Sequence, residues 1–147
     1  MGFWSGKKVL VAGGAGFIGS YVVENLLQQS ACVTVSDDLT PRRTQNLAAV
    51  CKEVTLRQTN FLDPDECLRA CKGQEIVLNL AARVAGVGYN SKHHGTMFRE
   101  NVLIGSHMIE AALRAQAERF LVVSSVCVYP HDCSVPTKEK EGFHERP

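Results

Sequence analysis

The sequence predicts an α/β fold: a doubly wound parallel sheet of about five strands, incomplete at its far edge. Three observations predict it. Short apolar runs alternate with segments of helical spacing at least four times, which requires parallel strands joined by right-handed crossovers. The first apolar run ends in a cluster of glycines. The chain has 147 residues, 45% of them hydrophobic, and this length suits one domain.

The amino-terminal half supplies three predicted strands. Residues 7–12 form an apolar run typical of a buried parallel strand, and residues 17–29 follow with apolar positions at helical spacing. Residues 32–36 form the second strand and residues 54–57 the third. Between these two strands, residues 39–50 are polar, so we expect a loop with about one helical turn.

A strong helix start follows the third strand. Asp63 can cap the free N–H groups, Pro64 suits the first helical position, and Gly73 suits the residue after the last turn. The remaining predicted elements are a fourth strand, a long helix and a fifth strand, at residues 75–80, 97–116 and 120–124.

Charge and hydropathy exclude several classes of partner. The formal net charge is +1, which gives no electrostatic reason to expect nucleic acid or an anionic membrane. No apolar run approaches the roughly 20 residues of a membrane span. Residues 1–8 are polar where a secretion signal has its apolar centre. We therefore expect a cytoplasmic protein.

Six cysteines are present, but their spacing fits neither a disulfide framework nor a metal site. None of them forms a Cys-x-x-Cys pair, so we expect no metal. Cys67 and Cys71 share one face of a helical segment. We interpret every cysteine except Cys127 as a reduced, mostly buried small apolar residue.

The glycine turn carries the most information. Gly13, Gly16 and Gly19 have a Gly-x-x-Gly-x-x-Gly spacing between a strand and a helix. The first permits the tight turn, the second lets a pyrophosphate approach the backbone, and the third lets the helix pack closely on the strand. Free N–H groups at the helix start, at Phe17 and Ile18, then bind the phosphates. The turn predicts a Rossmann-type dinucleotide-binding domain.

An acid at the end of the second strand indicates which dinucleotide binds. Asp37 lies 18 residues after Gly19, close to the roughly 20 expected for the carboxylate that binds the adenosine ribose. A carboxylate there repels a 2′-phosphate and favours NAD over NADP. Arg42 and Arg43 instead favour NADP, because guanidinium groups bind phosphate well, unless they are solvated loop charges. We expect an NAD-binding domain over residues 1–130, followed by an irregular segment over residues 131–147.

With these residues assembled, the chain resembles the extended short-chain dehydrogenase/reductase family, which contains the NAD-dependent nucleotide-sugar epimerases and dehydratases. The likeness covers residues 6–130. Besides the glycine turn, it rests on Asn-Leu-Ala-Ala at residues 79–82, on Glu-Asn-Val at residues 100–102 with Gly105, and on residues 119–130, which end Ser-Ser-Val-Cys-Val-Tyr-Pro.

The resemblance implies cofactor contacts. Ala81 and Ala82 would pass beside the dinucleotide, and Asn101 would steady the region after the fourth strand. Asn60, where the family often has an aspartate, and the following Phe61 would face adenine. An amide can still hydrogen-bond adenine.

The resemblance also implies substrate contacts. Ser125 would hydrogen-bond the reacting sugar oxygen, and Gly86 and Val87 would line the sugar site. Residues 85–89, with Ser91, His93 and Met97, resemble the GDP-mannose 3,5-epimerase and GDP-fucose synthase subfamilies. There a cysteine at the position of Cys127 is an acid/base on the sugar. A buried strand-end cysteine is the equal alternative. His93 and His94 fit loop residues better than catalysts.

The family's catalytic base, a tyrosine in Tyr-x-x-x-Lys, is not found at Tyr21, Tyr89 or Tyr129. We therefore expect a fragment of a longer enzyme, inactive alone, whose full-length form is a homodimer. That enzyme would transiently oxidise C4 of a nucleotide-sugar, with a GDP-sugar preferred. The alternatives are an NADP-dependent keto-sugar reductase of the same family and a non-catalytic dinucleotide-binding module.

Overall fold

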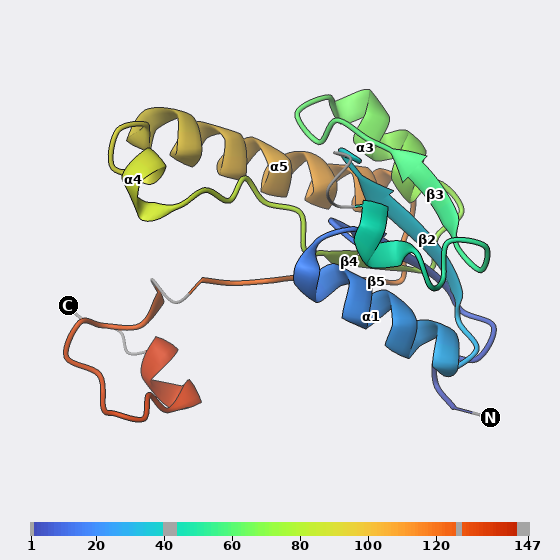
Figure 1. Ribbon diagram of the computed structural model, residues 1–147, viewed down its shortest axis with the longest axis horizontal. Coiled ribbons are helices and arrows are strands. Elements are labelled where there is room, and N and C mark those ends of the chain that lie inside the picture. The colour runs from blue at the N-terminus through green and yellow to red at the C-terminus, as the bar shows by residue number, and fades with distance from the viewer. Residues whose placement is uncertain (1, 40–43, 126–127, 144–147) are drawn as a thin grey trace.

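A five-stranded, fully parallel sheet forms the centre of the molecule, as the sequence predicts (Figure 1). The computed structural model describes residues 2–39, 44–125 and 128–143. The strand order is β3-β2-β1-β4-β5. The strands are β1 (Lys8–Ala12), β2 (Cys32–Asp37), β3 (Thr55–Gln58), β4 (Ile76–Asn79) and β5 (Arg119–Val122). The helices are α1 (Phe17–Gln28), η1 (Gln45–Leu47), α3 (Pro64–Cys71), α4 (Val87–Asn90), α5 (His94–Arg114) and η3 (Glu139–Phe143).

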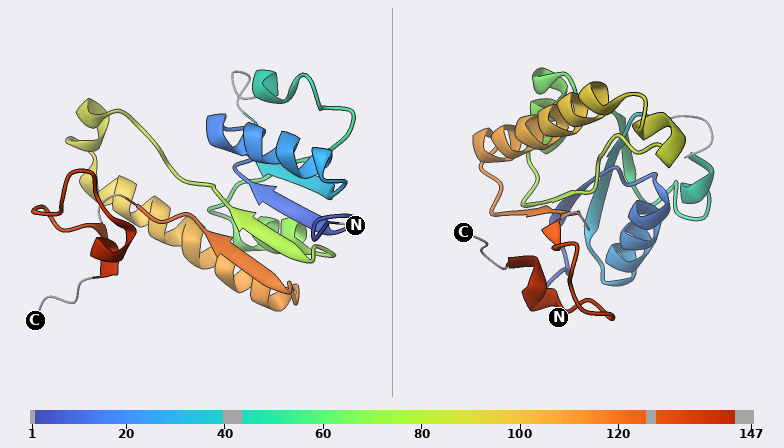
Figure 2. Two further views of the ribbon diagram at one scale, coloured as in Figure 1. Left: turned by 90° about the horizontal axis from the view of Figure 1, so that it is seen from below. Right: turned by 90° about the vertical axis from the view of Figure 1, so that its left-hand side faces the viewer.

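Each face of the sheet has its own apolar core. Along β1, Val9 and Val11 join the core under α1, whereas Leu10 and Ala12 join the core under α3 and α5. Figure 2 shows α1 and α5 on opposite sides of the sheet. A strand that is buried on both faces needs apolar residues in succession, and this explains the continuous apolar run that predicted β1.

The ends of α3 confirm the predicted helix signals. The Asp63 carboxylate accepts hydrogen bonds from the N–H groups of Asp65 and Glu66, at 2.8 and 3.2 Å. Pro64 is the first residue of the helix. Gly73 follows the last turn with φ +74°, a left-handed conformation that costs glycine little.

The segment before the long helix differs from the prediction. α5 begins at His94, three residues before the predicted start at Met97, and α4 was not predicted. Residues 91–96 are exposed, so they show no apolar periodicity from which a helix could be read. His94 is therefore helical rather than a loop residue. His93 precedes the helix, and its ring stacks on Tyr89 with centroids 3.9 Å apart.

The described cysteines differ in burial, and Cys133 is intermediate between the buried and the exposed ones. Cys67 and Cys71 are fully buried on one face of α3, as predicted. Cys32 and Cys51 are exposed, so the prediction of burial is wrong for both. Cys32 is the first residue of β2, at the rim of the sheet, and Cys51 lies in the loop before β3, where the core does not reach. Cys127 lies outside the described residues.

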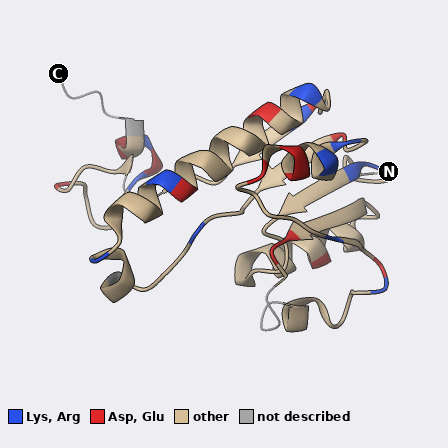
Figure 3. Cartoon of the chain, turned by 90° about the horizontal axis from the view of Figure 1, so that it is seen from above, with Lys and Arg blue, Asp and Glu red and all other residues tan. Residues whose placement is uncertain are grey.

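Charges of both signs lie side by side on the surface, for example along α5 (Figure 3). At the amino-terminal rim of the sheet, Lys7 Nζ lies 2.5 Å from Glu75 Oε1 and 3.2 Å from Glu118 Oε2. These residues precede β1, β4 and β5, so the cluster ties three strands together at the rim opposite the candidate site. Such exposed pairs add little stability.

After β5 the chain leaves the sheet. Residues 128–143 run away from it and include the short turn η3, which the sequence did not predict (Figures 1 and 2). Within the described residues, no helix is both long enough and apolar enough to span a bilayer.

Candidate dinucleotide-binding site

The candidate site lies at the carboxyl ends of the strands. β1 pairs with β2 on one side and with β4 on the other, so the strand order reverses at β1. In open parallel sheets, a ligand crevice forms at such a reversal. The glycine turn follows β1, Asp37 ends β2 and Asn79 ends β4. Residues from three strands therefore meet at this edge.

Two of the three glycines of the Gly-x-x-Gly-x-x-Gly spacing have no room for a side chain. A Cβ atom on Gly13 would lie 2.8 Å from the backbone nitrogen of Ala81, and Gly13 also has φ +76°. A Cβ atom on Gly19 would overlap the carbonyl oxygen of Gly13 and lie 2.7 Å from the Cα atom of Gly14. The positive φ of Gly13 suits the tight turn, and Gly19 lets α1 pack against the turn, as their spacing predicts. Gly13 also permits close contact with the segment after β4, which the spacing did not predict.

Gly16 directly precedes α1, and the first turn of this helix has no side-chain cap. Gly16 is the N-cap, with extended backbone and no side-chain cap. The side chains of Phe17 and Ile18 are 75% and 65% exposed. In these two residues it is the backbone N–H groups, at the positive end of the helix, and not the side chains that can meet an anion at the turn. A backbone cradle that a Cβ atom would fill, next to uncapped N–H groups, fits the pyrophosphate of a dinucleotide.

Asp37 is fully buried behind this turn. One carboxylate oxygen accepts a hydrogen bond from Ala15 N–H and the other from Leu39 N–H, both at 3.2 Å. The carboxylate therefore holds the glycine turn against β2. A carboxylate has about four acceptor positions, and these two N–H groups donate to two of them. Arg42 and Arg43 lie outside the described residues.

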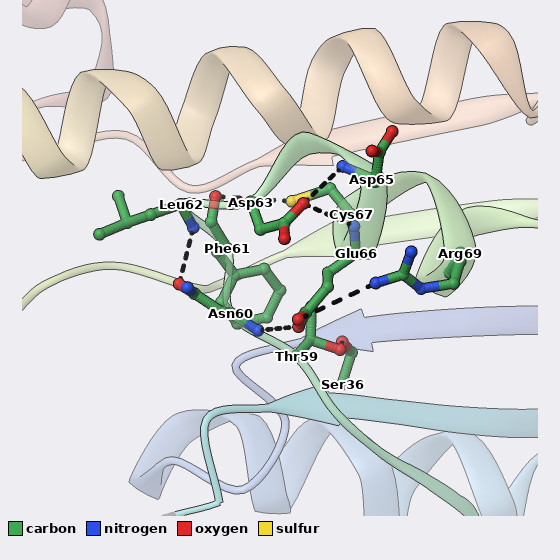
Figure 4. A network of polar contacts seen from close by, with 10 residues as sticks. All are labelled: Ser36, Thr59, Asn60, Phe61, Leu62, Asp63, Asp65, Glu66, Cys67 and Arg69. Carbon is green, nitrogen blue, oxygen red and sulfur yellow. Dashed lines mark hydrogen bonds and ion pairs between the residues drawn. The ribbon is translucent and has the colours of Figure 1, made fainter.

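A hydrogen-bond network fixes the loop after β3 (Figure 4). The N–H of Asn60 donates to Glu66 Oε2 at 2.6 Å, and Asn60 Oδ1 accepts from Leu62 N–H at 3.1 Å. Asn60 itself is exposed. The ring of Phe61 is instead buried in the core beside α5. Sequence reasoning missed Glu66 as a support of this loop.

Asn101 holds the segment after β4. Its Oδ1 accepts from Arg83 N–H at 2.8 Å, and its Nδ2 donates to the carbonyl oxygens of Arg83 and Met97 at 3.1 and 2.9 Å. These bonds place Asn101 as a support for the chain that follows Ala81 and Ala82. The Arg83 side chain pairs with Glu100, with 3.4 Å between Nη1 and Oε2.

A cavity of about 660 Å³ adjoins this segment. Ser125 lines it together with residues of α4, α5 and the loop before α4. Gly86 and Val87 lie at the start of α4 but are not among the lining residues. The side chain of Val87 and all of Cys127 lie outside the described part of the chain. The lining residues are Arg83, Val84, Ala85, Asn90, His94, Met97, Phe98, Asn101, Val102 and Ser125.

Sequence reasoning missed three polar residues of the cavity wall. Arg83, Asn90 and His94 come from the loop after β4, from α4 and from α5. No spacing rule joins them to Ser125, because only the fold brings these segments together. Within residues 2–39, 44–125 and 128–143, no cluster of His, Cys, Asp and Glu could hold a metal ion.

The strand order and the glycine turn define a Rossmann-type α/β protein. The chain belongs to the NAD dependent epimerase/dehydratase family, whose profile matches residues 9–146.

Curated relatives include nucleotide-sugar epimerases. The chain is 29% identical to GDP-mannose 3,5-epimerase 1 of Oryza sativa subsp. japonica, over 99% of this chain and 39% of the relative. It is 31% identical to UDP-glucose 4-epimerase of Yersinia enterocolitica, over 90% of this chain and 41% of the relative. The chain thus spans about two fifths of the length of these relatives.

Solved structures of epimerases share the fold. The epimerase Mth375 from Methanothermobacter thermautotrophicus superposes with a TM-score of 0.82 at 29% identity, over 94% of this chain and 41% of that one. A UDP-glucose-4-epimerase from Stenotrophomonas maltophila, with bound NAD and formylated UDP-arabinopyranose, gives a TM-score of 0.78 at 25% identity, over 90% and 41% of the two chains.

Proposed function

We propose that this chain is the NAD-binding part of a nucleotide-sugar epimerase or dehydratase whose substrate is a GDP-sugar. The observation that carries the proposal is the glycine turn, which leaves a backbone cradle beside the uncapped start of α1. The likeness to GDP-mannose 3,5-epimerases supports a GDP-sugar. Because the chain covers only part of these relatives, the activity belongs to the whole protein.

In this proposal the chain's own groups bind NAD in three places. The N–H groups of Phe17 and Ile18 donate to the pyrophosphate, Asp37 accepts from the adenosine ribose, and Asn60 meets adenine. The Asp37 carboxylate would repel a 2′-phosphate, so NAD is preferred over NADP. NAD, when bound, supplies the hydride acceptor for transient oxidation at C4 of the sugar.

Ser125 would bind the substrate. Its hydroxyl group hydrogen-bonds the C4 oxygen of the sugar and keeps it oriented, and its place in the cavity wall supports this role. Cys127 would move a proton at a neighbouring carbon, where a thiol is a suitable acid/base. The 147 residues contain no Tyr-x-x-x-Lys motif, so we expect them to bind NAD without turnover.

A second copy of the chain would cover the exposed apolar face of α5. Ile109 and Leu113 are 54% and 71% exposed on this helix. Contiguous exposed apolar residues of this kind mark interaction surfaces. This supports a homodimer of the full-length protein.

Calorimetric titration with NAD and NADP tests the cofactor assignment. We expect NAD to bind more tightly by at least about tenfold, and Asp37→Asn to narrow the difference because the charge that repels the 2′-phosphate is lost. Tighter binding of NADP would favour the keto-sugar reductase. Absence of binding by either dinucleotide would remove the proposal.

A further inference from the structure

Both backbone polar groups of Ala15, within the glycine turn, are held by side chains from outside the turn. Its N–H donates to Asp37 Oδ2 at 3.2 Å, and its carbonyl oxygen accepts a hydrogen bond from Asn46 Nδ2 at 2.9 Å. Ala15 is fully buried, so its backbone groups need partners within the protein. Asp37 ends β2 and Asn46 lies in η1. The orientation of the turn is therefore set in part by the segment that follows β2.

A buried neighbour anchors η1 and with it Asn46. Leu47 is almost fully buried and belongs to the core under α1, together with Val11 and Val23. Asn46 itself is exposed, so it adds a hydrogen bond to the glycine turn without adding to the core. The contribution of Asn46 can therefore be removed by mutation without leaving a cavity in the core.

The Ala15 carbonyl lies next to the predicted phosphate site. Ala15 directly precedes Gly16, the N-cap of α1, and the N–H groups of Phe17 and Ile18 follow. A carbonyl oxygen carries a partial negative charge, which opposes the approach of an anion unless a donor balances it. The Asn46 amide supplies that donor and holds the carbonyl towards η1.

We propose that Asn46 is a positioning residue for the cofactor, which holds the Ala15 carbonyl so that the glycine turn presents its N–H groups to the pyrophosphate. The inference rests on the proposed function, because it takes the ligand of the turn to be NAD. Asn46 acts through Ala15 rather than on the cofactor itself. Its loss should therefore weaken the binding of the pyrophosphate more than the binding of the adenosine, which the proposed function assigns to Asp37 and Asn60.

The variant Asn46→Ala tests the inference, with Asn25→Ala as the matched control. Asn25 is also exposed and also makes a side-chain hydrogen bond, from Gln29 Nε2 at 2.6 Å, but it lies in the second half of α1. The dissociation constants of NAD and of adenosine, which has no phosphate, are measured by NMR titration of the whole chain. We expect the preference for NAD over adenosine to fall about tenfold in Asn46→Ala and to stay unchanged in Asn25→Ala.

The ratio of the two affinities separates positioning from a purely structural role. A purely structural Asn46 predicts a lower Tm, with the binding of NAD and of adenosine weakened in equal proportion, and that result overturns the inference. An unchanged preference at an unchanged Tm overturns it too. If the wild-type protein binds NAD and Asn46→Ala keeps the wild-type preference, this inference falls while the NAD assignment stands. If the wild-type protein does not bind NAD, the proposed function falls as well.

Discussion

Gly13, Gly16 and Gly19 differ in what a side chain would meet at each position. At Gly13 and Gly19 the obstacle is backbone, which cannot move without distorting the turn. At Gly16 a Cβ atom would lie 3.2 Å from the Gly13 carbonyl oxygen, a tight contact that a small shift relieves. Gly16 therefore matters less for the packing of the chain than for the room that it leaves for a phosphate group.

Gly19→Ala should lose both stability and NAD affinity. The added methyl group overlaps the glycine turn, and overpacking of this kind costs about 1–3 kcal/mol. Gly105→Ala on α5 is the control, because a Cβ atom there meets nothing within 4 Å. Alanine favours the helix over glycine by about 1 kcal/mol, so this variant should be more stable. Urea unfolding measures the stability of both variants. Equal changes in their free energies of unfolding would contradict the crowding argument.

The two buried thiols of α3 should make stability fall at alkaline pH. Burial raises the pKa of Cys67 to about 12 and that of Cys71 to about 11, from an ordinary value of 9.0. Below pH 9 the thiols stay protonated in both states and the stability is intact. As pH rises from 9 towards these folded-state values, only the unfolded chain loses the protons, and each thiol removes up to about 1.4 kcal/mol per pH unit.

Urea unfolding as a function of pH measures this effect. The slope of the unfolding free energy against pH should be shallower in Cys67→Ala, whatever the cost of the cavity that this variant leaves. Cys51→Ala is the control, because Cys51 is exposed. An unchanged slope in Cys67→Ala would show that other groups cause the alkaline loss.

At the scale of elements, the helix cap of α3 gives a further stability prediction. Asp63→Ala removes the acceptor of two hydrogen bonds and should cost about 1 kcal/mol. Asp63→Asn keeps an acceptor at the same place and should retain most of that stability. Circular dichroism during urea unfolding compares the two. A loss of equal size in Asp63→Asn would mean that the charge matters rather than the cap.

Elements with an apolar period could be predicted from the sequence, and those without one could not. β1, α1 and α3 lie within a residue or two of their predicted bounds, because each packs on a core and carries a cap or a glycine at its end. α4 and η3 have only four and five residues, too few to show a helical period.

The same division holds within the candidate site. The spacing of Gly13, Gly16 and Gly19 indicates their roles because they are neighbours in one turn. Asn90 and Ser125 are 35 residues apart in the sequence and line one pocket only because the chain returns through α5 and β5. Spacing also does not show that Phe61 packs in the core beside α5, because that contact joins residues far apart in the chain.

For the molecule as a whole, the exposed face of α5 predicts self-association. Leu113→Glu would place a charge in the proposed contact between two copies and should weaken dimerisation by about tenfold or more. Gln28→Glu places the same acid on the exposed surface of α1 and should have no effect. Sedimentation velocity distinguishes the two. A wild-type protein that sediments as a monomer at all concentrations would contradict this prediction.

The central position of β1 has a consequence for how the molecule opens. β1 is paired along both of its edges, whereas β3 and β5 are each paired along one. Deuterium should therefore enter the amides of β5 first, through local fraying, and those of β1 only when the whole chain unfolds. The glycine turn follows β1, the strand that stays paired longest. Binding of the cofactor at this turn should therefore persist while the edge strands fray.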